Sequence, residues 1–179
     1  ETVWGALDPK SEGFQEAGNW TGVLFAVQAI GSILWAMVLP MFKSVKVGYS
    51  LSLVLGAVGF ISTYFIHDQY LLFLSFILIG CAWAAMLAMP FALLTNSLSG
   101  KSMGSYLGLF NCTICLPQIV AALVGGFLFK TFGGEKVELI SNGVATEVQS
   151  GQIMMLVIAG VSLLLAAIAV FGISTRKAK

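Results

Sequence analysis

The chain has 179 residues, of which 58% are hydrophobic and only 9% are charged, and its formal net charge at pH 7 is +1. An ordinary soluble domain is about 25% charged, so this composition is atypical of a soluble protein. The nearly neutral balance also gives no electrostatic basis for binding nucleic acid or a strongly acidic partner.

Charged residues are absent from five long stretches, and all 17 of them lie between these stretches or at the ends of the chain. A helix needs about 20 apolar residues to cross a bilayer core of about 30 Å. We therefore predict an all-α, polytopic membrane protein with residues 1–16 as an extracytoplasmic loop and residues 17–179 as a transmembrane bundle. The predicted helices span about 20–42, 47–66, 70–98, 103–129 and 151–174.

The helix predicted over 20–42 begins next to Asn19, a helix-capping residue type, and Trp20, an interfacial anchor. Gln28 and Ser32 lie four residues apart and therefore share one face. An amide at membrane depth needs a hydrogen-bond partner, so Gln28 is a candidate substrate-binding residue.

In the helix over 47–66, glycines and hydroxyl residues recur every three or four positions. This narrow face favours close helix packing over ligand contact. Its members are Gly48, Ser52, Gly56, Gly59 and Thr63.

The helix over 70–98 contains Pro90, which permits a bend, and Trp83 near the middle of the span. Tryptophan in membrane proteins is enriched at the interfaces, so an indole at mid-depth either packs against other helices or lines a polar cavity. Both alternatives stay open, and Trp83 is a second candidate for substrate binding.

The helix over 103–129 carries a stripe that is small at its ends and polar in its middle. Asn111 and Gln118 lie seven residues apart on this stripe, and Pro117 frees a backbone carbonyl beside them. The two amides serve either as contacts between helices or as a site for a hydroxyl-rich ligand, and we favour the site. The stripe consists of Gly104, Gly108, Asn111, Cys115, Gln118, Ala122 and Gly125.

The helix over 151–174 has no amide or charge, so we expect it to face lipid. No predicted helix contains an ionisable Asp, Glu, His, Lys or Arg, and no catalytic constellation is present at membrane depth. Cys112 and Cys115 form a C-x-x-C without further ligands, which favours packing over metal binding. We therefore predict no enzyme activity, no metal site and no cofactor.

The net charges of the connecting loops alternate in sign along the chain. Counting only Lys and Arg, one set of loops holds six and the opposite set holds three. The positive-inside rule then places the N-terminus outside and the C-terminus in the cytoplasm of a plasma or inner membrane. An outside start without a signal peptide, and the odd number of helices, predict further helices upstream, so we expect a C-terminal fragment.

Three segments resemble a known family. Residues 83–94 (WAAMLAMPFALL) resemble the tenth helix of sugar transporters of the major facilitator superfamily, and residues 18–25 (GNWTGVLF) resemble the start of the eighth. Residues 101–111 (KSMGSYLGLFN), followed by 116–119 (LPQI), resemble the loop into the eleventh. The likeness is closest to the glycoside–pentoside–hexuronide:cation symporters and the related sucrose/maltose transporters.

This resemblance implies that the five helices correspond to helices eight to twelve of twelve, with alternating access between two six-helix halves. It implies a neutral sugar as substrate, such as a glycoside, sucrose or maltose. It also implies symport with H⁺ or Na⁺ bound outside this segment, and the missing N-terminal helices and membrane lipid as partners. Two alternatives remain, namely a membrane-embedded structural or anchoring subunit, and a facilitator for another neutral solute such as a nucleoside.

Overall fold

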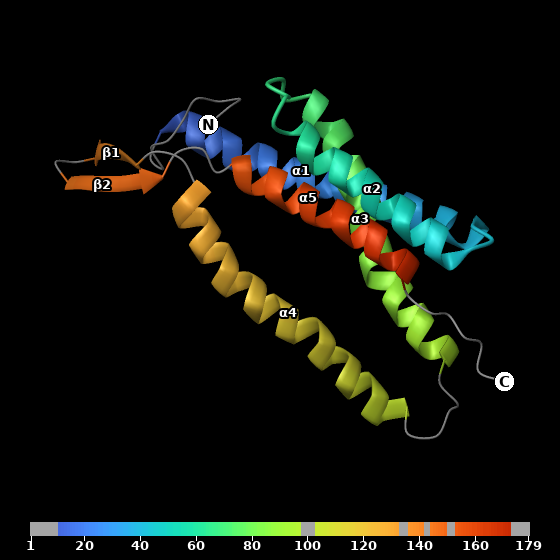
Figure 1. Ribbon diagram of the computed structural model, residues 1–179. Helices are drawn as coiled ribbons and strands as arrows, with labels where there is room; N and C mark the ends of the chain where they lie inside the picture. The colour runs from blue at the N-terminus through green and yellow to red at the C-terminus, as the bar shows by residue number, and fades with distance from the viewer. Residues whose placement is uncertain (1–10, 98–102, 133–135, 142–143, 150–152, 173–179) are drawn as a thin grey trace.

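The computed structural model describes residues 11–97, 103–132, 136–141, 144–149 and 153–172. Five long helices dominate it (Figure 1). They are α1 (Glu12–Val38), α2 (Val45–Ser62), α3 (Leu71–Ser97), α4 (Met103–Phe132) and α5 (Ile153–Ala169). The shorter elements are the 3₁₀ turns η1 (Leu39–Met41) and η2 (Val170–Gly172), and the strands β1 (Lys136–Ser141) and β2 (Val144–Gln149).

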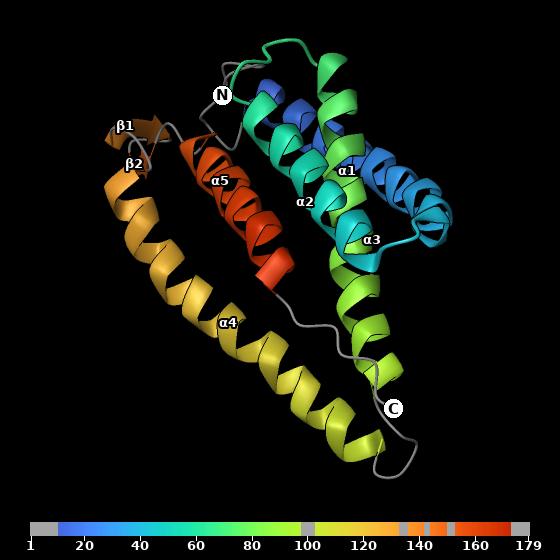
Figure 2. The same cartoon turned by 45° about the vertical axis from the view of Figure 1, so that its right-hand side comes forward.

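Five helical segments of the described chain are long and apolar enough to cross a bilayer. They run antiparallel in succession, so α1 and α2 meet at one end of the bundle while α2 and α3 meet at the other (Figures 1 and 2). The prediction of an all-α, polytopic membrane fold with five spans is therefore confirmed.

The first helix begins earlier than predicted. Ser11 precedes α1, and its hydroxyl oxygen accepts a hydrogen bond from the backbone N–H of Phe14 at 3.2 Å. Glu12 lies in the first turn, where a carboxylate interacts favourably with the positive end of the helix dipole. Residues 12–16, predicted as loop, are thus helical, because a capped and hydrated turn can extend a helix beyond its apolar span.

Local sequence also explains the other ends. Pro40 lies in η1 and cannot supply the N–H that would continue α1 as an α-helix. Between α2 and α3, the Asp68 carboxylate accepts hydrogen bonds from the N–H groups of Tyr70 (2.8 Å) and Leu71 (3.1 Å) and caps α3. The helix predicted over 47–66 ends at Ser62, and the one predicted over 103–129 continues to Phe132.

A feature that the sequence analysis did not anticipate lies between α4 and α5. Strands β1 and β2 pair antiparallel, with Lys136 opposite Gln149 and Ser141 opposite Val144. This hairpin lies beyond the end of α4, at the end of the molecule where α1 begins (Figure 1). Its short, charged strands belong to a connection outside the apolar spans.

Helix α2 packs against both α3 and α5, and α1 packs against α3. All five members of the small-residue face of α2 are buried, from Gly48 to Thr63. A Cβ added at Gly59 would lie 2.7 Å from the carbonyl oxygen of Ser75, and one added at Gly160 of α5 would lie 3.0 Å from that of Ala57. Close helix packing, the interpretation favoured for this face, is confirmed.

Hydroxyl-mediated hydrogen bonds connect neighbouring helices. The Trp35 indole N–H of α1 donates to Ser52 Oγ at 2.8 Å, and the Ser50 hydroxyl donates to the carbonyl of Ala167 in α5 at 3.0 Å. Ser62 and Ser75 share a hydrogen bond of 2.8 Å between α2 and α3. In an apolar medium such contacts add modestly to packing and fix the helices in register.

The uniform apolarity of α5 predicted that it faces lipid, but the structure shows that one side of it packs against α2. Gly160, Ala167 and Val170 are buried against α2, while Leu165 and Ile168 on other faces are exposed. A small-residue face beside a bulky one allows this division, because small residues permit close backbone contact.

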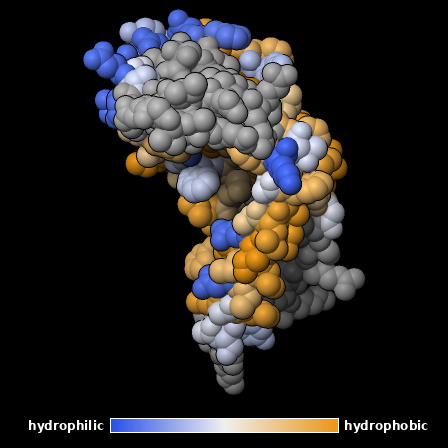
Figure 3. Space-filling view, turned by 90° about the vertical axis from the view of Figure 1, so that its left-hand side faces the viewer, coloured by the Kyte–Doolittle hydropathy of each residue, from blue (hydrophilic) through white to orange (hydrophobic). Residues whose placement is uncertain are grey.

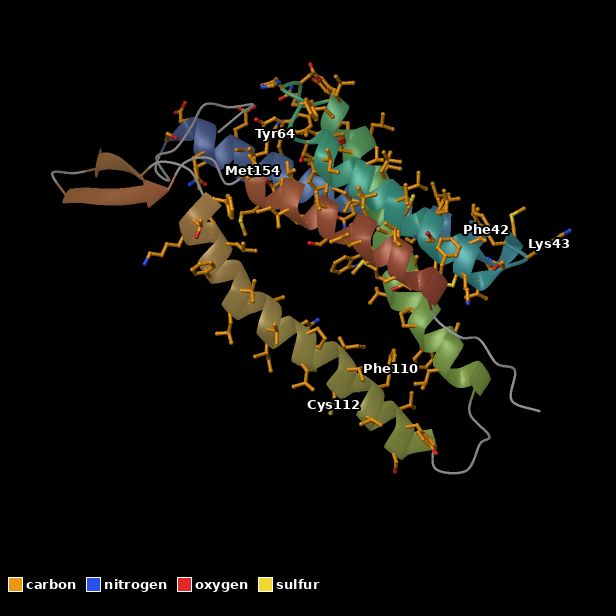
Figure 4. All side chains as sticks on the ribbon, in the orientation of Figure 1. Phe42, Lys43, Tyr64, Phe110, Cys112 and Met154 are labelled. Atoms are coloured by element: carbon orange, nitrogen blue, oxygen red, sulfur yellow. The ribbon has the colours of Figure 1, made fainter. Side chains whose placement is uncertain are left out.

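Helix α4 stands apart from the other four (Figures 1 and 2). No residue from Gly104 to Phe132 is buried. It meets α5 over a few residues, and the ring of Phe110 lies 6.4 Å from that of Phe91 in α3. Figure 4 shows Phe110 on the side of α4 that faces α3 and Cys112 on the opposite side.

The surface has the polarity expected of a membrane protein. Figure 3 shows a broad apolar region below a hydrophilic end, with a few hydrophilic residues within the apolar part. Lys43 lies at the other end of the bundle, opposite Tyr64 (Figure 4). The charged residues of the described loops thus flank the apolar spans.

Candidate functional site

A pocket of about 420 Å³ lies among α1, α2, α3 and α5. Ligand pockets in proteins are typically about 300–1,000 Å³, so the pocket is large enough for a small solute. Ten residues line it: Phe25, Gln28, Ala29, Ser32, Phe60, Thr63, Phe76, Ile79, Trp83 and Leu156.

Close helix contacts hold the walls of this pocket in place. Gly80 of α3 lies directly against the carbonyl of Gln28, and the Ser32 hydroxyl donates to the Gly80 carbonyl at 2.9 Å. Gly59 likewise brings α2 close to Ile79. The glycines therefore allow α1, α2 and α3 to approach closely. The cavity lies where larger residues beside these glycines hold the helices further apart.

The lining contains no charged side chain. Three phenylalanines and Trp83 supply aromatic surface, and the rings of Phe25 and Phe76 meet edge to face with centroids 6.0 Å apart. Phe25 and Trp83 are each more than half exposed, so the pocket opens to the surface on the side of α1 and α3. Such a site disfavours ions, because it offers no opposite charge to offset their desolvation.

Some polar groups of the pocket already form hydrogen bonds within the protein, and others do not. The hydroxyls of Ser32 and Thr63 donate to backbone carbonyls, at 2.9 Å to Gly80 and at 2.6 Å to Phe60. Within the described chain, neither the Gln28 amide nor the Trp83 indole N–H has a hydrogen-bond partner. These two groups are available for a ligand.

The structure brings two of the four predicted site residues together. Gln28 of α1 and Trp83 of α3 line the same pocket, although they are 55 positions apart in the sequence. Cavity lining, one of the two alternatives for Trp83, is thus the one that the geometry favours.

The other two predicted residues lie elsewhere. Asn111 and Gln118 are exposed on α4, and no residue of α4 lines the pocket. Neither side chain has a hydrogen-bond partner among the described residues. The polar stripe of α4 and the pocket are therefore two separate candidate surfaces.

Sequence reasoning missed most of the pocket. Phe25, Phe60, Phe76 and Leu156 are apolar residues in apolar helices, and nothing in their spacing distinguishes them from packing residues. Thr63 belonged to the small-residue face of α2, but its position at the end of that face gave no sign of a cavity. Among the described residues, no group of three His, Cys, Asp or Glu could hold a metal ion.

The family model described as Major Facilitator Superfamily matches residues 4–179. The chain belongs to the major facilitator superfamily. Members of this superfamily are membrane transporters, which agrees with the five candidate spans among the described residues. No curated protein and no solved structure shows a significant similarity to the chain.

The superfamily predicted from three sequence segments is thus confirmed, together with integral membrane location and a transport role. The match is to the major facilitator superfamily as a whole and does not extend to its sugar-transporting branch. Substrate, coupling ion and orientation remain predictions.

Proposed function

We propose that the chain forms part of a secondary transporter that moves a neutral sugar across the membrane by alternating access. The observation that carries this proposal is the uncharged pocket, where Gln28 offers an amide and Trp83 offers an aromatic face. Amides hydrogen-bond to hydroxyls, and an aromatic ring can pack against the C–H face of a sugar. The resemblance of residues 83–94 and 101–111 to sugar transporters supports the same substrate class.

Uptake of a labelled neutral disaccharide into proteoliposomes tests this function. We expect saturable uptake by the wild type, and loss of most of it in Gln28→Ala and Trp83→Ala. Ser162→Ala is the matched control, because the Ser162 hydroxyl donates only within α5, to Ile158 at 2.9 Å, and does not line the pocket. Unchanged uptake in both pocket variants, at normal protein levels, would remove the pocket from the transport route.

Cation symport is part of the proposal, with the coupling H⁺ or Na⁺ bound outside this segment. The lining of the pocket includes no carboxylate to bind a cation, so the proposal places the cation site elsewhere in the transporter. Collapsing the H⁺ and Na⁺ gradients separately with ionophores tests it. Symport predicts that one of the two treatments abolishes accumulation, whereas accumulation that survives both would exclude it.

We further propose that α1 begins outside a plasma or inner membrane and that the C-terminus is cytoplasmic. The support is the excess of Lys and Arg in the loops that include Lys43 and Lys46. Single cysteines at Lys46 and Asp68, in a background without other cysteines, can be labelled with an impermeant maleimide. In intact cells we expect labelling at position 68 only, and the opposite pattern would invert the topology.

A second candidate function is facilitated movement of another neutral solute, such as a nucleoside. The three phenylalanines and Trp83 in the lining favour it, because a flat base can stack on aromatic side chains. Equilibration of a labelled nucleoside without accumulation, in the absence of disaccharide uptake, would favour this function over sugar symport.

A further inference from the structure

The pocket is better suited to an apolar ring than to a polyhydroxylated one. Six of its ten lining residues are Phe, Trp, Ile or Leu, and these provide most of its surface. A sugar ring carries a hydroxyl on nearly every carbon, and each hydroxyl that loses water without a new partner weakens binding.

The hydrogen-bonding capacity of the pocket is correspondingly small. The hydroxyl protons of Ser32 and Thr63 are already donated to backbone carbonyls. The groups left to donate are the Gln28 amide and the Trp83 indole N–H, and the Gln28 carbonyl is the one unpartnered amide acceptor of the lining. The Ser32 and Thr63 oxygens can still accept, so the lining offers three N–H donors and three acceptor oxygens, fewer than a solute with a hydroxyl on nearly every carbon requires.

We infer that the pocket is a subsite for an apolar ring of the transported solute, with Gln28 and Trp83 binding a polar atom at the edge of that ring. The inference rests on the proposed function for its role in transport. It names the solute class more narrowly, as a neutral molecule that joins an aryl or cyclic hydrocarbon group to a hydroxyl-bearing part. Phe25, Phe60 and Phe76 then surround the apolar ring, and Gln28 fixes its orientation.

A pair of neutral glucosides that differ only in the apolar group can test this inference. The protein is reconstituted in lipid nanodiscs, and the equilibrium binding of phenyl β-glucoside and methyl β-glucoside is measured. Stacking against aromatic side chains should make phenyl β-glucoside bind about tenfold more tightly. Equal affinities for the two glucosides would overturn the inference.

Variants then assign the preference to the pocket. Phe76→Ala and Trp83→Ala should reduce the preference for the phenyl compound to near unity, whereas Trp83→Phe should retain most of it because the ring remains. Gln28→Leu, which keeps the side-chain bulk, should weaken the binding of both glucosides by a similar factor. Phe127→Ala, an exposed aromatic truncation on α4 outside the pocket, is the control and should leave the preference unchanged. A preference that survives Phe76→Ala and Trp83→Ala, or that is lost in Phe127→Ala, would place the apolar subsite elsewhere.

This experiment separates the subsite from the proposed function. If phenyl β-glucoside binds preferentially but no neutral solute is transported, the subsite stands and the transport proposal fails. If a disaccharide is transported while the phenyl group adds no affinity, the transport proposal stands and the subsite fails. Circular dichroism and thermal unfolding of each variant identify any that have lost the fold, and Phe76→Ala keeps the test decisive if Trp83→Ala is one of them.

Discussion

Substitution of Gly59 by alanine should force α2 and α3 apart. An added Cβ would lie 2.7 Å from the carbonyl oxygen of Ser75, 2.9 Å from Ile79 Cγ1 and 3.0 Å from the backbone nitrogen of Ile79. The first of these distances is about 0.7 Å less than the 3.4 Å at which ordinary contact begins. Two of the three atoms belong to the backbone, so no side-chain rotation can make room.

Overpacking of this kind costs about 1–3 kcal/mol. The neighbouring Ser62–Ser75 hydrogen bond of 2.8 Å would also be strained, which adds up to about 1 kcal/mol. We therefore expect Gly59→Ala to lower the free energy of unfolding by about 1–4 kcal/mol. Reversible unfolding in mixed micelles with increasing sodium dodecyl sulfate measures it.

Gly126→Ala on α4 is the matched control. An added Cβ there meets nothing within 4 Å, and alanine is the better helix former, so stability should be unchanged or slightly higher. A Gly59→Ala variant as stable as the wild type would refute the close packing of α2 on α3, and with it the position of the pocket walls.

Three further predictions concern a hydrogen bond between helices, a helix cap, and the exposure of the α4 stripe to water. Ser32→Ala removes the hydroxyl that joins α1 to the α3 backbone and should lower the free energy of unfolding by about 0.5–1.5 kcal/mol, whereas Ser162→Ala should lower it less. Equal decreases in the two variants would contradict the interhelical role of Ser32. Asp68→Ala removes the cap of α3 and should lower the free energy of unfolding by about 1 kcal/mol. Asp68→Asn should retain most of that stability, because asparagine also caps helices. A loss in Asp68→Asn equal to that in Asp68→Ala would argue against the cap. If the polar stripe of α4 faces water, a hydrophilic thiol reagent should modify Cys115, which lies on the stripe, faster than Cys112, which lies beside it; equal rates would place the stripe in lipid.

The spans and their packing surfaces were predictable because a bilayer imposes simple rules on a sequence. Charge-free stretches marked all five helices, and the repeat from Gly48 to Thr63 marked the face on which α2 packs. Helix ends were less predictable, since the cap at Ser11 and the first turn after it lie outside the apolar span. The β1–β2 hairpin was missed because its strands are short and lie in a charged connection, where hydrophobicity gives little signal.

The candidate site was predictable only where a polar side chain stood out against an apolar background. Gln28 and Trp83 did so, and the structure places them in one pocket. Phe25, Phe60 and Phe76 could not be predicted, because the choice between packing and cavity lining depends on how neighbouring helices cross. Asn111 and Gln118 stood out equally, but α4 holds them away from the pocket.

The pocket with Gln28 and Trp83 and the α4 stripe with Asn111 and Gln118 differ in polarity in a way that relates the two surfaces. The pocket is largely apolar, whereas the α4 stripe has small residues and two amides that lack a hydrogen-bond partner among the described residues. A solute with an apolar and a hydroxyl-bearing part matches the two surfaces in turn. Loss of uptake in Asn111→Ala or Gln118→Ala, with normal protein levels, would assign the stripe to the same transport route. Unchanged uptake and affinity would leave the stripe with a packing role.

The central claim is that this member of the major facilitator superfamily carries neutral solutes past an uncharged site. The most direct measurement compares a labelled neutral disaccharide with a carboxylate-bearing analogue of the same size in proteoliposomes. We predict saturable uptake of the neutral compound, competition by unlabelled neutral glycosides, and no saturable uptake of the carboxylate. Saturable uptake of the carboxylate in preference to the neutral compound would contradict this account.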